Sequence, residues 1–137
     1  MSLQIEMLEQ SFAQLKPHLD EFGASFYQSL FSRYPEAKPL FAATDMSQQQ
    51  QKLITSLIFV IGNLRHPELL ATALQSLGAK HVGYGAQPEH YLLVGETLLA
   101  TFADYLGPAW TPELKQAWSE AYRAISELML AGAEQAN

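Results

Sequence analysis

His81 ends an otherwise apolar helical stripe, so its imidazole is the first side chain whose chemistry needs an explanation. The stripe consists of Leu70, Leu74 and Leu77, at spacings of four, three and four residues up to His81. At about 3.6 residues per turn, these four side chains share one face of a helix. The ring is therefore either a core histidine bonded to a nearby carbonyl group, or a ligand whose nitrogen holds a molecule against that face.

Other residues that could do chemistry are sparse. His18, His66 and His90 stand next to prolines or at a helix start, where we expect them in solvent. No His-Glu-x-x-His spacing or carboxylate cluster indicates a zinc or calcium site. The absence of cysteine excludes thiolate metal sites, disulfides and thioether-linked cofactors. The lone Gly83-Tyr84-Gly85 fragment ends the helix of His81 and does not predict a phosphate-binding loop.

The composition argues against several classes of partner. The 137 residues are 48% hydrophobic and 16% charged, with a net charge of −6. Nucleic-acid binding needs clustered basic residues, and the eight Lys and Arg residues are scattered. The longest apolar run, Leu57 to Ile61, is too short to cross a membrane, and Glu6 lies where a signal peptide needs apolar residues. We therefore expect a cytoplasmic protein with no nucleic-acid and no membrane partner.

Proline and glycine divide the sequence into helices, and no strand alternation separates them. We expect a single all-α domain over residues 1–137, with six main helices and one short 3₁₀ segment. The expected starts are Ser2 as an N-cap, Pro17, Pro35 for the 3₁₀ segment to Phe41, a capping box at Ser47 and Gln50, Pro67, Pro88, and Thr111 as the N-cap ahead of Pro112.

Five short blocks occur along the chain in a fixed order: residues 26–31 (FYQSLF), 34–41 (YPEAKPLF), 80–81 (KH), 90–95 (HYLLVG) and 117–122 (AWSEAY). Together they resemble the single-domain bacterial globins of the flavohaemoglobin type, over essentially the whole chain. The resemblance implies the globin fold, a helical sandwich around a haem pocket, with non-covalent haem b (iron protoporphyrin IX) as cofactor. Globin folds also occur without haem, so each site residue needs its own argument.

The resemblance makes His81 the proximal ligand of the haem iron. One ring nitrogen would bind iron while the other donates to a carbonyl one turn back, near Leu77. Phe41 matches the aromatic residue that packs against the porphyrin, and Pro35 matches the proline that turns the chain toward it. Without haem, Phe41 would be an ordinary core residue. Lys80 matches a family lysine, and is either a partner of a haem propionate or a solvated surface residue.

On the other side of the haem, Tyr27 matches the family's distal tyrosine, and Gln49 and Leu53 match its distal pair. Because Gln49 belongs to a run of four glutamines, its alternative is a position outside the pocket. A hydroxyl and an amide donate hydrogen bonds, which favour dioxygen because it gains negative charge on iron, whereas carbon monoxide gains little. One such bond is worth about 1.5–3 kcal/mol. The resemblance thus implies a pocket that holds dioxygen tightly.

The proximal side departs from the family, in which a tyrosine and a glutamate form a relay behind the histidine. Tyr91 matches the tyrosine, but Ala133 occupies the glutamate position and Glu134 follows one residue later. One residue is a rotation of about 100° on a helix, so Glu134 replaces the glutamate only if the helix end shifts. We expect a neutral His81 and a protein that binds oxygen more than it catalyses redox chemistry.

Three functions compete. The first is reversible binding of dioxygen for storage, delivery or buffering, with carbon monoxide and nitric oxide as other gas ligands. The second is nitric oxide dioxygenation with an external reductase, because the sequence to Asn137 contains no flavin or nicotinamide domain and is not expected to turn over alone. The third is a haem-based gas sensor or a haem-free helical module, although a sensor needs an output domain. We expect a monomer or a homodimer.

Overall fold

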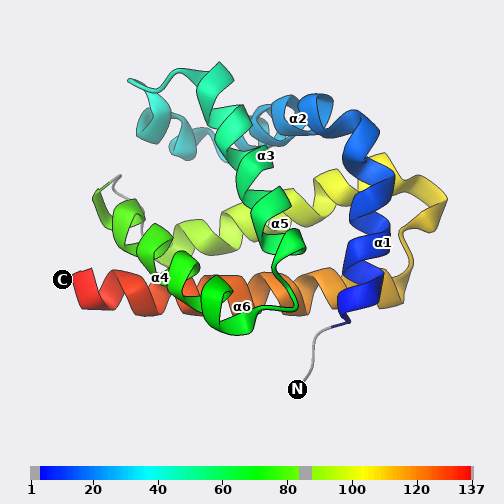
Figure 1. Ribbon diagram of the computed structural model, residues 1–137. Helices are drawn as coiled ribbons and strands as arrows, with labels where there is room; N and C mark the ends of the chain where they lie inside the picture. The colour runs from blue at the N-terminus through cyan, green and yellow to red at the C-terminus, as the bar shows by residue number, and fades with distance from the viewer. Residues whose placement is uncertain (1–3, 84–87, 137) are drawn as a thin grey trace.

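Six α-helices and three short 3₁₀ segments build the part of the chain that the computed structural model describes, residues 4–83 and 88–136 (Figure 1). This confirms the all-α prediction. None of the described helices is long and apolar enough to cross a membrane. The elements are α1 (Ile5–Leu15), η1 (Lys16–His18), α2 (Leu19–Arg33), η2 (Pro35–Phe41), α3 (Met46–Gly62), α4 (Pro67–Gly83), α5 (Pro88–Leu106), η3 (Gly107–Ala109) and α6 (Pro112–Ala136).

Several predicted helix ends are confirmed. Pro67 and Pro88 are the first residues of α4 and α5, and η2 spans the predicted 3₁₀ segment. Thr111 caps α6, because its Oγ1 accepts the backbone N–H of Leu114 at 3.1 Å. Helix α4 ends at Gly83, as the glycines predict. Tyr84 and Gly85, from the same fragment, lie outside the described residues.

Other predicted helix ends are wrong. Ser47 does not cap α3, because Asp45 stands before the helix and its carboxylate accepts the backbone N–H groups of Ser47 and Gln48 at 3.0 and 3.4 Å. A carboxylate also interacts favourably with the positive end of the helix dipole, so the capping-box match was the weaker signal. Pro17 lies in η1, and α2 begins only at Leu19. Gln4 precedes α1, while Ser2 lies outside the described residues.

The core is aromatic at its centre. Phe102 of α5 stacks on Trp118 of α6 with ring centroids 4.2 Å apart, and Phe22 of α2 lies 5.0 Å from Phe102 on another side. The indole N–H of Trp118 donates to Ser11 Oγ at 2.9 Å, and that hydroxyl donates to the carbonyl oxygen of Met7 at 2.8 Å. This chain of bonds joins α1 to α6 while leaving no donor of the indole unsatisfied.

Helix α4 carries His81. Its contact with α6 is the most extensive contact between any two of the described helices. Leu70 and Leu74 of its predicted stripe are buried, and Leu77 is half buried against the same core. The position of His81 therefore depends mainly on how α4 rests on α6.

Candidate functional site

His81 lies in the last turn of α4 and is half buried. Its Nδ1 atom is 2.8 Å from the backbone carbonyl oxygen of Leu77, one turn earlier. Because a carbonyl oxygen only accepts hydrogen bonds, Nδ1 carries the proton, and in a neutral ring Nε2 then carries the lone pair. The backbone of α4 thus holds the imidazole in the tautomer whose Nε2 atom can bind a metal.

Tyr91 of α5 lies beside this imidazole, with ring centroids 6.5 Å apart. Tyr122 of α6 donates its hydroxyl hydrogen to the backbone carbonyl oxygen of Tyr91, at 2.6 Å. Gly95 makes room for the ring of Tyr122, because a Cβ atom there would lie 2.6 Å from Tyr122 Cε2. Burial raises the pKa of Tyr122 far above its ordinary value, so the hydroxyl remains a neutral donor. These contacts fix the backbone of α5 next to His81.

Tyr27 of α2 is buried, with 6% of its surface exposed. The side-chain amide of Gln49, on α3, donates to Tyr27 Oη at 3.0 Å. Burial raises the pKa of Tyr27, and the bond from Gln49 opposes only part of that effect. Since the hydroxyl oxygen accepts from Gln49, the hydroxyl hydrogen of Tyr27 is available to a different acceptor. Gln49 is the member of the glutamine run whose amide reaches Tyr27.

Phe41 stands at the end of η2 and makes edge contacts with two other rings. Its centroid lies 5.6 Å from that of Tyr27 and 5.5 Å from that of Phe31. Leu53 of α3 is half buried against the same core. The local turn at Pro35 and the 3₁₀ geometry of η2 bring Phe41 back onto α2. The three aromatic rings therefore come from two elements, α2 and η2, and α3 adds the aliphatic Leu53.

The predicted site residues form two groups and one outlier. One group comes from α2, η2 and α3, and the other from the end of α4 and the start of α5. In Figure 1, η2, the end of α4 and the start of α5 are drawn on the same side of the molecule. Lys80 is exposed, which fits either a propionate partner or a solvated residue. The first group is Tyr27, Phe41, Gln49 and Leu53, and the second is Leu77, His81 and Tyr91.

The residues near the relay position leave the carboxylate outside. Ala133 is half buried and Glu134 is exposed at the end of α6. The Glu134 carboxylate is therefore exposed to solvent. His90, predicted to lie in solvent, is half buried, whereas His18 and His66 are exposed as expected.

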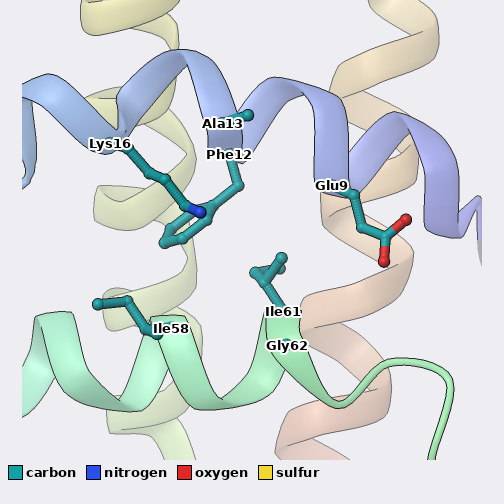
Figure 2. Close-up of a pocket in the computed structure, with 7 residues that line it drawn as sticks. All are labelled: Glu9, Phe12, Ala13, Lys16, Ile58, Ile61 and Gly62. Atoms are coloured by element: carbon teal, nitrogen blue, oxygen red, sulfur yellow. The ribbon is translucent and has the colours of Figure 1, made fainter.

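A separate cleft of about 280 Å³ lies between α1 and α3, and none of the predicted site residues lines it (Figure 2). Its walls are mainly apolar, with Phe12, Ile58 and Ile61 among them. The Glu9 carboxylate beside it is already paired with Arg65, at 2.9 Å. Lys16 also lines the cleft, and no carboxylate of the described residues forms an ion pair with its ammonium group.

Sequence reasoning missed several residues that position the site. Phe31 packs against both Tyr27 and Phe41, and Tyr122 with Gly95 holds the backbone of Tyr91. A glycine inside a helical pattern costs about 1 kcal/mol relative to alanine, so Gly95 was the available signal of a close approach. The partner of that glycine lies 27 residues away on another helix, where no local pattern identifies it.

The helical architecture is that of the globins. Residues 24–129 match the Globin family, and the chain belongs to that family of haem proteins. The globin-like protein of Aquifex aeolicus is 33% identical over 92% of this chain and 88% of its own length. The match to solved structures agrees, since a bacterial globin from Campylobacter jejuni superimposes with a TM-score of 0.84 at 25% identity, covering 96% of this chain and 95% of that one.

Other relatives are flavohaemoproteins and an engineered enzyme. The flavohaemoprotein of Rhizobium meliloti is 38% identical over 80% of this chain, but the match spans only 27% of that protein. This chain therefore covers about a quarter of the length of such relatives. An engineered carbene transferase from Rhodothermus marinus, derived from a protein classed as a nitric oxide dioxygenase, superimposes with a TM-score of 0.87 at 30% identity, over 98% of this chain and 95% of that one.

The donor set of the site fits haem. Iron in haem prefers a neutral imidazole nitrogen on its proximal side, and the bond from His81 Nδ1 to Leu77 makes Nε2 that nitrogen. The flat apolar faces of a porphyrin need aromatic and aliphatic surfaces, which Phe41, Leu53 and Leu77 present as half-buried side chains. With no cysteine in the sequence, a covalent thioether link is excluded.

Proposed function

We propose that the chain holds haem b through His81 and binds dioxygen reversibly on the side of Tyr27. When bound, haem supplies an iron atom that takes a diatomic gas as its ligand. The observation that carries the proposal is the hydrogen bond from Gln49 to Tyr27 Oη. This bond orients a buried hydroxyl and uses its oxygen as the acceptor, so the hydroxyl hydrogen can still be donated to a ligand. Carbon monoxide and nitric oxide are the other gases that such a site takes.

In this proposal, different residues act on the proximal and distal sides of the haem. His81 supplies a neutral nitrogen whose orientation is set by the carbonyl of Leu77. Tyr27 donates its hydroxyl hydrogen to a ligand that gains negative charge, and its raised pKa keeps the phenol protonated at neutral pH. Phe41 and Leu53 exclude water, which strengthens that hydrogen bond by lowering the local dielectric.

An absorption spectrum of the purified protein, reduced and in air, tests the proposal. We expect one b-type haem per chain, and His81→Ala or His81→Leu should abolish tight haem retention. His66→Ala is the matched control, because His66 is exposed. If the His81 variants kept a proximal-histidine spectrum, another histidine would be the ligand and the assignment would fail.

Nitric oxide dioxygenation is the second candidate, favoured by the structural likeness to the Rhodothermus marinus protein. In that reaction nitric oxide, dioxygen and one electron give nitrate, so a reductase must supply the electron. The same hydroxyl of Tyr27 would retain dioxygen until nitric oxide arrives. Nitrate formation by the haem-loaded chain with an added flavin reductase would support this function, and its absence at normal dioxygen binding would exclude it.

A further inference from the structure

Helices α4 and α6 meet backbone to backbone at two glycines. A Cβ atom on Gly78 of α4 would lie 1.9 Å from the carbonyl oxygen of Met129 on α6. A Cβ atom on Gly132 of α6 would lie 1.9 Å from the carbonyl oxygen of Gln75 on α4. Each helix therefore places a glycine against the other's main chain, where any side chain would be excluded.

These glycines are needed for space and not for their backbone conformation. Neither has a positive φ, so alanine would be compatible with the local helix geometry. Glycine is the poorest helix former after proline, so two of them inside long helices oppose helix formation. Close packing of the two main chains is the feature that offsets this cost.

The crossing lies next to the residue that we assign as the iron ligand. Gly78 precedes His81 by three residues, which places them about 60° apart around the axis of α4. Leu77, whose carbonyl oxygen holds the imidazole, is the neighbour of Gly78. The turn that orients the ring is thus the same turn that rests on α6.

We infer that Gly78 and Gly132 are positioning residues for the proximal ligand: their contact sets how far α4 stands from α6, and so where His81 presents Nε2. This inference rests on the proposed haem site. It assigns the position of the His81 side chain relative to α6 to a backbone contact between the two helices. Ala133 stands at the position where the resemblance expects a glutamate.

The main test is Gly132→Ala in the haem-loaded protein. An ordinary contact needs 3.4 Å where only 1.9 Å is present, so α4 and α6 must separate by about 1.5 Å near the Gln75 carbonyl. We expect a shifted Fe–His stretching band in the deoxy form and haem loss about tenfold faster or more. Gly62→Ala is the matched control, because a Cβ atom there meets nothing within 4 Å and should change neither readout. An unshifted Fe–His band in folded Gly132→Ala would overturn the inference.

A second comparison separates positioning from general damage. In His81→Gly, free imidazole can serve as the iron ligand without a link to α4. If the glycines act through α4, adding Gly132→Ala to this variant should leave the iron–imidazole band unchanged. A band that shifts equally with free imidazole would show that the substitution acts elsewhere in the pocket, and the inference would be wrong. Retention of a histidine spectrum in His81→Gly would instead refute the haem assignment itself.

A third measurement does not depend on any variant folding. In a crystal structure of the haem-loaded chain, Gly78 should still lie against the Met129 carbonyl and Gly132 against that of Gln75. Separation of the two main chains by the width of a side chain would contradict the inference.

Discussion

At the scale of single residues, the main consequence of the structure is that Gln49 and Tyr27 act in series. The amide of Gln49 donates to the hydroxyl oxygen of Tyr27, and the hydroxyl hydrogen stays available to a different acceptor. Under the proposed function, Tyr27 would be the direct donor to a bound gas, and Gln49 would orient and polarise that donor. The two residues should therefore contribute unequally and non-additively.

We predict that Tyr27→Phe raises the dissociation rate of dioxygen by about ten- to hundredfold, the equivalent of one charge-assisted hydrogen bond. Carbon monoxide dissociation should change much less, because that ligand gains little charge. Gln49→Leu should change dioxygen release in the same direction by a smaller factor, and should add little in the Tyr27→Phe background. Flash photolysis and stopped-flow mixing measure these rates. Equal effects on both gases would mean that Tyr27 acts through pocket shape.

A second prediction concerns the proximal charge. Because Glu134 is exposed and Ala133 has no carboxylate, His81 should keep its carbonyl bond to Leu77 and remain a neutral ligand. We expect an Fe–His stretching frequency in the range of neutral-histidine globins and weak peroxidase activity, both unchanged in Glu134→Gln. A high, peroxidase-like frequency that falls in Glu134→Gln would show that this carboxylate acts as the relay.

At the scale of elements, proline and apolar spacing predicted most helices, but the contacts between helices could not be predicted from the sequence. Pro67, Pro88 and Thr111 mark helix starts through local geometry alone, which a sequence displays directly. Asp45 and Ser47 are both residues that can cap a helix, and in the folded chain Asp45 is the cap of α3. The site followed the same division, since His81 and its carbonyl partner Leu77 follow from spacing on one helix, while Tyr122, which holds the neighbouring Tyr91, lies on another helix.

The bond between Trp118 and Ser11 gives a prediction at this scale. Ser11→Ala removes the acceptor of a buried indole N–H, so the free energy of unfolding should fall by about 1–3 kcal/mol. Chemical denaturation measures the loss. Ser119→Ala is the matched control, because its hydroxyl donates only to the Lys115 carbonyl on the same helix, and its effect should stay within about 0.5 kcal/mol. Equal losses in both variants would show that the buried indole bond carries no special weight.

At the scale of the whole molecule, buried tyrosines couple stability to alkaline pH. Burial raises the pKa of Tyr27 and of Tyr122 above the ordinary value of 10.0. In the unfolded chain both phenols ionise near that value, while in the folded chain they stay protonated. Their contribution to stability is therefore complete below pH 10 and is lost as the pH rises above 10 toward the folded pKa values.

We predict that the free energy of unfolding falls between pH 8 and pH 11 by about 1.4 kcal/mol for Tyr122, beyond the loss from other groups, and that Tyr27 adds a fall in the same direction. Urea denaturation at both pH values measures the fall, and phenolate absorbance follows ionisation. In Tyr122→Phe the fall should be smaller by that amount, and in the double variant with Tyr27→Phe it should be smaller still, whatever the variants cost at pH 8. Because both hydroxyls lie in the core contacts that hold α2, α3, α5 and α6 together, their absorbance should rise only with unfolding. Ionisation of either residue in the folded protein near pH 10 would mean that water reaches these helix contacts, and that the donor hydroxyl of Tyr27 is not shielded.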